Sequence, residues 1–378
     1  MRILHLASFS GNIGDLANHQ GFRKMFAETI DSSTEWTNVE IRQFYWKERA
    51  FDIEFIKEIN QYDLFVIGGG NYLELWVDSS PTGTSLAFPL HLFEQIEIPV
   101  LFNALGVDNG QGVSESALEK FSAFLKIINN NPKIFLSVRN DGSYSTLQKY
   151  FPDDAFTKVF KCPDGGFNSF FQVSDEGSNE KRNILIGVNL ACDMPGIRFT
   201  SDFTIDDFSK SFAHLLVKLG EKNVDSEFVF FPHIYSDYDI FYRVILNLPD
   251  RFRRTRLRIS SYGPGISGAE KTFSDYNLCD LVLGMRFHSN VYSIAQGIPT
   301  IGIENYPQIG KLYSDLGFNS GVVKVQASKD FQSLLDLSEK YLNESKKYKE
   351  IYSDIAEKMK DQYYSYGESL KSWIVNNY

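Results

Sequence analysis

The sequence predicts a two-domain α/β protein in which each domain is a parallel sheet with crossover helices. At 378 residues the chain exceeds the size at which a single core usually keeps growing. Short apolar runs alternate with glycine-rich or polar turns and then with segments of helical period. This alternation restarts at Ile184, after a polar stretch from Val173 to Asn183 that we interpret as a linker. We therefore expect domains at 1–178 and 179–345 that face a central cleft, and a helix at 346–378 that packs back across them.

In the first half, each expected strand is a short apolar run, as is typical of a buried parallel sheet. The expected strands are Arg2 to Ala7, Val39 to Gln43, Leu64 to Ile67, Val100 to Phe102 and Ile134 to Leu136. The segments with helical period between and after them are Asp15 to Thr29, Ile53 to Asn60, Thr84 to Gln95, Glu115 to Ile128 and Ser143 to Tyr150.

The second half repeats the pattern and indicates a second doubly wound unit. Its expected strands are Ile184 to Leu190, Phe228 to Phe231, Leu257 to Ser260, Leu281 to Leu283 and Thr300 to Ile303. Helices are expected near Asp206 to Leu219, in the apolar run Val291 to Ala295, and through the charged stretch Asp330 to Tyr378. Ligands of open parallel sheets bind outside the carboxyl ends of the strands, so the loops that follow strands are the candidate sites.

Composition and charge narrow the class of protein. The formal net charge of −10 disfavours a nucleic acid partner. The chain shows neither a secretory signal pattern nor 18 consecutive apolar residues, so we expect a cytoplasmic protein, with the inner face of the membrane as an option. Three widely spaced cysteines, Cys162, Cys192 and Cys279, fit packed residues in a reducing compartment and argue against a zinc site. We expect no metal and no cofactor.

One local run departs from the acidic balance. Five arginines lie between Arg251 and Arg258, and the alternation of the last three predicts one face of a strand. Such runs are usually a solvated surface. The alternative is a peripheral contact with an anionic membrane or a lipid-linked ligand.

The first candidate loop runs from Ser8 to Asp15 and joins the first strand to the first helix. Gly11, Asn12 and Gly14 would let the backbone approach an anion at the start of that helix, or would form a tight structural turn. Asp15 is expected to cap the helix. The loop lacks the full G-x-G-x-x-G spacing, so a dinucleotide site is poorly supported.

Two further loops follow strands of the first half. Gly68, Gly69, Gly70 and Asn71 come after Ile67, where consecutive glycines indicate a ligand or a neighbouring backbone close by. Arg139 follows another strand, and its fork of donors suits a carboxylate or a phosphate. A salt bridge between Arg139 and Asp141 is the alternative interpretation.

The most informative segment runs from Gly284 to Ser289, after a buried strand. It places Arg286 and His288 at one strand-to-helix junction, so an anion-binding side chain and a proton-exchanging side chain share a loop. His233, also after a strand, is a second candidate. His19 is a weaker partner of the first glycine loop. His5 and His214 lie in apolar surroundings and are expected to be packed.

With these residues in view, the chain resembles the polysaccharide pyruvyl transferase family over most of its length. The matching segments are Gly11 to Asp15, Val66 to Gly70, Ser137 to Arg139, Cys162-Pro163-Asp164, Gly284 to His288 and Gly297-Ile298-Pro299. The resemblance implies two Rossmann-like domains similar to B-type glycosyltransferases. It also implies transfer of a pyruvyl group from phosphoenolpyruvate to a sugar of a surface polysaccharide or its precursor, commonly as a ketal.

The resemblance also implies roles for the candidate residues. Arg286 and His288 match the family's R-x-H segment directly, as the donor-binding and proton-transfer groups. Arg139, His233 and Lys311 are expected to complete the donor site. The partner is then phosphoenolpyruvate, with a saccharide acceptor that is free or linked to a lipid or nucleotide carrier.

The acceptor side is less defined. Gly11, Asn12, Gly14, Asp15, Gly69, Gly70 and Asn71 are its candidates. The segment Asn71 to Trp76 departs from the aspartate-containing stretch of the family, which puts the acceptor's identity in doubt. Tyr72 and Trp76 would stack on a sugar ring or pack in the core.

Two other functions remain open. One is a B-type glycosyltransferase that uses a nucleotide sugar, for which Glu304 would hold the ribose. The other is a non-catalytic sugar-binding or assembly protein.

Overall fold

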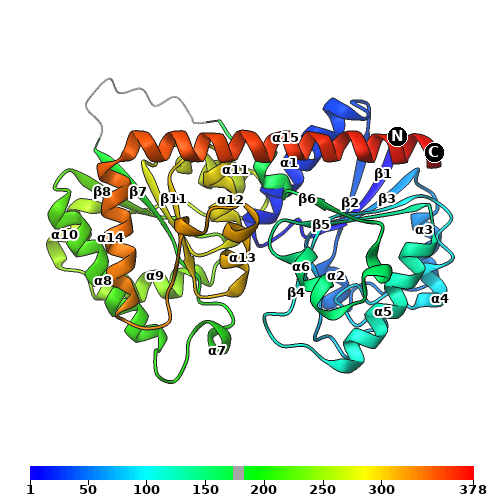
Figure 1. The fold of residues 1–378 in the computed structure, drawn as a ribbon, viewed down its shortest axis with the longest axis horizontal. Coiled ribbons are helices and arrows are strands. Elements are labelled where there is room, and N and C mark those ends of the chain that lie inside the picture. The colour runs from blue at the N-terminus through cyan, green and yellow to red at the C-terminus, as the bar shows by residue number, and fades with distance from the viewer. Residues whose placement is uncertain (173–182) are drawn as a thin grey trace. The chain divides into compact units, whose positions relative to one another are not determined.

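The computed structural model describes residues 1–172 and 183–378, which form two compact units (Figure 1). Unit 1 comprises Met1–Ser10, Asn18–Asn168 and Lys360–Tyr378, and unit 2 comprises Gly11–Ala17 and Ser169–Met359. The expected linker, apart from Asn183, and the expected boundary at 178/179 lie outside the described residues. The domain ranges therefore stay a prediction.

Unit 1 contains a six-stranded parallel sheet in the order β2-β1-β3-β4-β5-β6. Its strands are β1 (Arg2–Ala7), β2 (Glu35–Glu40), β3 (Leu64–Glu74), β4 (Val100–Asp108), β5 (Ile134–Arg139) and β6 (Val159–Cys162). The helices of this part of the chain are α1 (Ile13–Thr29), α2 (Arg42–Tyr45), α3 (Ile53–Ile59), α4 (Leu90–Phe93), α5 (Glu115–Asn130) and α6 (Ser143–Tyr150). The order in which the strands are added to this sheet reverses between β1 and β3. Parallel sheets bind ligands at such a switch point.

Unit 2 contains a second six-stranded parallel sheet in the order β12-β11-β10-β7-β8-β9. Its strands are β7 (Ile184–Asn189), β8 (Ser226–Phe230), β9 (Leu257–Ile259), β10 (Leu281–Gly284), β11 (Thr300–Glu304) and β12 (Val322–Lys324). This is the Rossmann order, and its switch point lies between β7 and β10.

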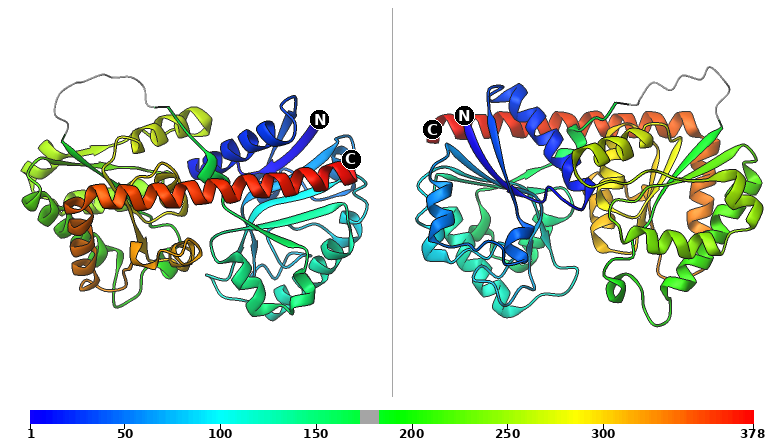
Figure 2. Two further views of the ribbon diagram at one scale, coloured as in Figure 1. Left: turned by 45° about the horizontal axis from the view of Figure 1, so that its top comes forward. Right: turned by 180° about the vertical axis from the view of Figure 1, so that it is seen from behind.

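Helices cover both faces of each sheet (Figure 2). In unit 2 they are α7 (Pro195–Arg198), α8 (Ile205–Lys222), α9 (Asp237–Leu246), α10 (Asp250–Arg256), α11 (Gly265–Tyr276), α12 (Phe287–Ala295), α13 (Pro307–Asp315) and α14 (Asp330–Asn343). The last helix, α15 (Ser345–Asn377), contributes its first part to unit 2 and its second part to unit 1. No helix of the described residues combines the length and apolar character that crossing a bilayer requires.

The core of unit 1 has two layers because successive strand residues point to opposite faces of the sheet. Leu4 and Leu6 belong to one apolar cluster, and Ile3 belongs to the other. The second cluster includes side chains of α1 and of the end of α15, among them Phe22 and Tyr366. The sheet is therefore buried on both faces, as its continuous apolar strands indicate.

Local signals set several helix starts. Ser114 accepts the Ala117 N–H at the start of α5. At α8, Thr204 and Asp207 form a reciprocal capping box. At α1, the Asn12 side chain accepts the Gly14 N–H at 3.0 Å. The prediction that Asp15 caps α1 is therefore wrong, because Asp15 lies inside the first turn.

Several expected elements differ from the structure. The strand expected at Val39 to Gln43 is β2, four residues earlier in the chain; it is an edge strand with mostly polar, exposed side chains, so it lacks an apolar run. The helix expected at Thr84 to Gln95 is reduced to α4 because Pro89 precedes its first turn. The strands expected to end at Ile67 and Phe102 continue to Glu74 and Asp108.

The expected strand face of arginines is wrong. Arg251, Arg253, Arg254 and Arg256 lie in the helix α10, and Arg258 follows in β9. Arg254 pairs with Asp250 one turn away at 2.8 Å, and Arg258 pairs with Glu227 at 3.1 Å. The pair between Arg254 and Asp250 has i,i+4 spacing, which favours the helix.

Candidate active site

Arg286 lies at the switch point of unit 2, two residues after the end of β10 and immediately before α12. Its Nε donates to Asp237 Oδ2 at 2.9 Å, and its Nη2 donates to Asp193 Oδ1 at 3.0 Å and to Asp237 Oδ1. The side chain is 9% exposed and Asp237 is fully buried. Burial lowers the pKa of Arg286, but Asp237 and Asp193 outweigh it and raise the pKa above its usual value. Arg286 is thus a fixed cation.

Asp193 joins Arg286 to a second arginine. Arg198 Nε lies 3.3 Å from Asp193 Oδ1, and Arg198 also donates to Asn305 at 2.9 Å. Burial raises the pKa of Asp193, but the two arginines lower it below its usual value overall. The two positive charges of the arginines formally balance the two negative charges of Asp193 and Asp237. Asp193, with 29% of its side chain exposed, is the accessible carboxylate of the cluster.

The backbone around Arg286 is held by asparagines. Asn189, at the end of β7, accepts the Arg286 N–H at 2.9 Å and donates to the Phe231 carbonyl at 2.8 Å. Asn290 donates to the carbonyls of Gly284 and Arg286 at 3.0 and 2.8 Å. The loop is therefore preorganised by neighbouring strands and by the helix that it starts.

His288 lies in the first turn of α12 and packs against the glycine loop that starts α1. A methyl group at Gly14 would lie 2.6 Å from both Cβ and Cγ of His288. Residues 11–17 belong to unit 2, as does His288. Only a glycine at this position leaves room for the imidazole.

The same loop makes other contacts within unit 2. The Tyr262 hydroxyl donates to the Gly11 carbonyl, and Ile13 N–H donates to the His233 carbonyl at 3.2 Å. Gly11, Asn12, Gly14 and Asp15, which were expected as acceptor or cleft residues, thus share the unit that carries Arg286. Their role stays a prediction.

His233 is fully buried, and its Nε2 lies 2.9 Å from the Tyr276 hydroxyl. Burial lowers the pKa of His233 well below its usual value, and Arg286 and His288 lower it further. The backbone N–H of His233 donates to Asp237 Oδ2 at 2.9 Å. His233 is a neutral side chain behind Asp237, so its contact with the cluster is through the backbone.

Glu304 and Lys311 belong to β11, the strand next to β10 in the sheet, and to the helix that follows it. Lys311 is the fifth residue of α13, which follows β11, and Glu304 is the last residue of β11. Burial raises the pKa of Glu304, while Lys324 lowers it. A methyl group at Gly310 would lie 2.7 Å from the carboxyl carbon of Glu304, so this glycine makes room for the acid.

Arg139 is the last residue of β5 in unit 1, not a loop residue. Its Nε donates to Asp141 Oδ2 at 2.6 Å, and its Nη1 lies 3.7 Å from Asp164 Oδ2. Asn18 also donates to Asp164 at 2.6 Å. The side chain forms the alternative expected from the sequence, a salt bridge with Asp141, and it is buried.

The glycine triplet lies inside β3, where Gly68 and Gly70 pair with Asn103 and Leu105 of β4. Gly68 has a φ of 110°, which side-chain-bearing residues rarely adopt. A methyl group at Gly69 would lie within 2.6 Å of the Asn18 amide, and one at Gly70 within 2.6 Å of the Tyr72 hydroxyl. The neighbouring side chains and backbone of unit 1 account for these glycines.

Beyond the triplet, β3 ends in a polar group. Asn71 Nδ2 donates to Asp108 Oδ2 at 2.9 Å, and Glu74 is the register partner of Asp108. Burial, and to a lesser extent Asp108, raise the pKa of Glu74 to about 7, although Ser85 opposes this shift by hydrogen bonding. Sequence reasoning missed Glu74 and Asp108 because the strands were expected to end earlier.

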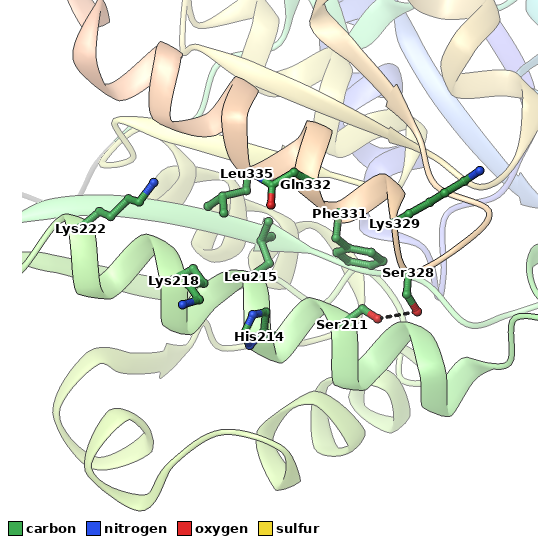
Figure 3. A pocket seen from close by; sticks show the side chains of 10 residues that line it. All are labelled: Ser211, His214, Leu215, Lys218, Lys222, Ser328, Lys329, Phe331, Gln332 and Leu335. Atoms are coloured by element: carbon green, nitrogen blue, oxygen red, sulfur yellow. Dashed lines mark hydrogen bonds between the residues drawn. The ribbon is translucent and has the colours of Figure 1, made fainter.

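Two of the hollows among the described residues lie away from the Arg286 cluster. One in unit 2, of about 470 Å³, lies between α8 and α14, where Phe331 and Leu215 form an apolar floor and Ser211 donates to Ser328 (Figure 3). It contains no expected site residue. The hollow shows that the packing predicted for His214 is wrong, because the side chain lies on the polar face of α8 and is exposed. The other, in unit 1, is lined in part by Tyr45 and Ser85.

The expected packing of Cys162, Cys192 and Cys279 is confirmed: all three are buried, and they form no disulfide with one another. His5 is fully buried, as expected. His19 Nε2 contacts the Ser8 carbonyl at 2.9 Å and is buried in unit 1. In the ranges 1–172 and 183–378, no group of three or more acidic, histidine or cysteine side chains is arranged to hold a metal ion.

Comparisons with solved structures define the class of fold. UDP-GlcNAc 2-epimerase from Neisseria meningitidis superposes with a TM-score of 0.56 at 10% identity over 100% of both chains. A glycosyltransferase from Rickettsia africae gives 0.55 at 14% identity over 100% of this chain and 99% of the other. HepE from Anabaena gives 0.54 at 11% identity over 100% of both chains. The prediction of two Rossmann-like domains similar to B-type glycosyltransferases is confirmed.

The family is defined by the sequence. The family model of polysaccharide pyruvyl transferases matches residues 12–306. A search of curated proteins finds no match. The chain belongs to the polysaccharide pyruvyl transferase family, as its motifs predicted, and the matched range contains both the Arg286 cluster and the polar end of β3.

Proposed function

We propose that the protein transfers the pyruvyl group of phosphoenolpyruvate to a sugar of a surface polysaccharide or its precursor, as a ketal. The observation that carries this proposal is that Arg286 and His288 lie at the same strand-to-helix junction, at the switch point of the unit 2 sheet. The first supplies a fixed cation, and the second supplies an imidazole that can donate or accept a proton. Membership of the family supports the same transfer.

Phosphoenolpyruvate carries a phosphate and a carboxylate, so it needs cations that are not fully neutralised. In the cluster, Asp237 is fully buried and holds Nε and Nη2 of Arg286, whereas Asp193 is partly exposed. An anionic group of the donor replaces Asp193 beside Arg286 and Arg198. Asp237 meanwhile keeps the guanidinium oriented, as a bidentate partner does. Lys311 remains a candidate for the second anionic group.

The transfer needs proton movements. His288 protonates the methylene carbon of the donor, and a sugar hydroxyl attacks the adjacent carbon and loses its proton. Phosphate leaves with one proton, and a second hydroxyl closes the ketal and returns a proton to His288. One hydroxyl proton thus ends in the new methyl group and the other on phosphate. In unit 1, the guanidinium of Arg139 already pairs with Asp141 and approaches Asp164. Its role is therefore to orient these two carboxylates.

The test is incubation of the full chain with phosphoenolpyruvate and a panel of hexose and amino-sugar acceptors. We expect release of phosphate and the added mass of a pyruvyl ketal on one acceptor. His288→Ala should lose turnover while it still binds phosphoenolpyruvate. Arg286→Lys should weaken donor binding because an ammonium lacks the fork that pairs with Asp237 and the donor together. Normal activity in either variant would remove that residue from the site.

A nucleotide-sugar glycosyltransferase is the second candidate, because Glu304 ends β11 next to the Arg286 strand in the sheet. The solved structure of HepE contains UDP and glucose. Release of a nucleoside diphosphate from a sugar nucleotide, without turnover of phosphoenolpyruvate, would favour this candidate and reject the pyruvyl transfer.

A further inference from the structure

A buried hydrogen-bond donor beside the Arg286 cluster has no partner among the described residues. This atom is Nδ2 of Asn305, the first residue after β11. The amide is oriented by its other polar atom, because Asn305 Oδ1 accepts a hydrogen bond from Arg198 Nη1 at 2.9 Å and a guanidinium can only donate. Buried polar atoms of native proteins are usually satisfied, so this donor points to a ligand that accepts a hydrogen bond.

Asn305 and the two arginines of the cluster come from the ends of three neighbouring strands. Asn305 follows β11, Arg286 follows β10, and Arg198 lies in α7 after β7, and these strands are adjacent in the order β11-β10-β7. Asp193 links the arginines, because its Oδ1 lies 3.0 Å from Arg286 Nη2 and 3.3 Å from Arg198 Nε. All four residues belong to unit 2. Their polar atoms therefore meet at the switch point of one sheet, where such sheets bind ligands.

The electrostatics of Arg198 favour an anion. Its side chain is 6% exposed, and burial lowers its pKa below the usual value. Asp193 opposes this shift, whereas Arg286 adds to it. The two arginines thus repel each other and share Asp193, which is the accessible carboxylate of the cluster. An anion that takes the place of Asp193 leaves neither buried cation unpaired.

The acid next to Asn305 does not oppose such a ligand strongly. Burial raises the pKa of Glu304, which favours the neutral carboxyl, and Lys324, its register partner in β12, offsets the charge that remains. The helix α13 begins at Pro307, two residues after Asn305, and the start of a helix favours a negative charge. The surroundings of the Asn305 amide therefore accept an anion.

The set of donors fits a phosphate better than a carboxylate. A carboxylate has two oxygens, and a single guanidinium fork already satisfies both. Arg286, Arg198 and Asn305 instead offer donors from three separate side chains. A phosphate group has three strong acceptor oxygens, so it can accept a hydrogen bond from each of them.

We propose that Asn305 Nδ2, Arg198 and Arg286 form a phosphate-binding site, and that this site holds the phosphate of phosphoenolpyruvate. The identity of the ligand rests on the proposed pyruvyl transfer, whereas the phosphate site does not. When the phosphate replaces Asp193 beside the arginines, Asn305 Oδ1 keeps Arg198 oriented and Nδ2 donates to a phosphate oxygen. Lys311 then remains the candidate for the carboxylate of the donor.

The test compares Asn305→Asp with Asn247→Asp, which adds the same charge at the exposed C-cap of α9 in unit 2. Aspartate keeps an oxygen for Arg198 but replaces the Nδ2 donor by an oxygen that repels an anion. Binding of inorganic phosphate, phosphoenolpyruvate and UDP to the full chain is measured by isothermal titration calorimetry. We expect Asn305→Asp to bind inorganic phosphate and phosphoenolpyruvate about tenfold more weakly than wild type, because a charge-assisted hydrogen bond is lost. Asn247→Asp should match wild type.

Arg198→Lys is the second variant. It keeps the positive charge but lacks the fork that contacts Asp193 and Asn305 together, so it should also weaken the binding of both phosphate ligands. Urea unfolding checks that each variant is folded. In the assay of phosphate release, Asn305→Asp should raise the KM for phosphoenolpyruvate by about tenfold and change kcat much less, as expected for lost ground-state binding.

Wild-type affinity for inorganic phosphate and phosphoenolpyruvate in folded Asn305→Asp, or in Arg198→Lys if the first variant does not fold, would overturn the site. Weaker binding of phosphoenolpyruvate alone, with unchanged affinity for inorganic phosphate, would overturn the assignment to phosphate, because the site would then hold the carboxylate. Binding of none of the three ligands by wild type would also overturn the site. If wild type binds UDP in a manner that depends on Asn305 but does not bind phosphoenolpyruvate, the phosphate site stands and the pyruvyl transfer is rejected.

Discussion

Gly14→Ala tests whether His288 must occupy its observed position. The new methyl group would lie 2.6 Å from Cβ and Cγ of His288, whereas ordinary contacts begin at 3.4 Å. His288 is only 6% exposed, so the imidazole cannot move freely aside. It must shift by close to 1 Å, and a misplacement of about 1 Å can cost about 100-fold in rate. Overpacking of this kind destabilises by about 1–3 kcal/mol.

The assay measures phosphate release at saturating phosphoenolpyruvate and acceptor, together with urea unfolding to show that the variant is folded. Gly196→Ala is the matched control because a methyl group there meets nothing within 4 Å. If Gly14 acts only through His288, adding Gly14→Ala to His288→Ala should reduce kcat no further. A folded Gly14→Ala protein with kcat within twofold of wild type would refute the reasoning.

Two further predictions concern stability. Asp237→Asn breaks the buried pair with Arg286 and should lower the free energy of unfolding in urea by about 3–5 kcal/mol. Asp250→Asn breaks exposed pairs and should lower it by less than about 1 kcal/mol. Equal losses in the two variants would contradict this account. The raised pKa of Glu74 means that the folded state holds a proton that the unfolded state releases above about 4.5, so stability from this group falls as pH rises to about 7. Glu74→Gln should remove that loss and stabilise the protein at pH 8 by on the order of 1–3 kcal/mol, with little effect at pH 4.5; the same gain at both pH values would show that another cause operates.

The sequence predicted those parts of the fold that have a local signal. The apolar strands β7 and β10 were recognised, and with them the junction that carries Arg286 and His288. The edge strand β2 was misplaced because four of its six residues are polar and three are exposed, so it shows no apolar run. The glycines of β3 resemble a turn in sequence, yet they continue the ladder because neighbouring side chains occupy the space beside them.

The partners of the site residues could not be predicted in the same way. Asp237 and Arg286 are 49 residues apart, and only the folded sheet brings them together. The contact of Gly14 with His288 likewise joins the start of the chain to α12 of unit 2. A motif identifies a residue that can bind an anion, but the carboxylates that already hold it depend on tertiary structure.

The two polar clusters, one in each unit, differ in their balance of charge. In unit 2, two arginines face two aspartates, and one of these, Asp193, is partly exposed, so an incoming anion has a carboxylate to replace. In unit 1, the single arginine of the cluster, Arg139, already pairs with Asp141 and approaches Asp164. Asn71 Oδ1 and Glu74 Oε2 have no hydrogen-bond partner among the described residues. The first cluster therefore suits an anion better than the second cluster does.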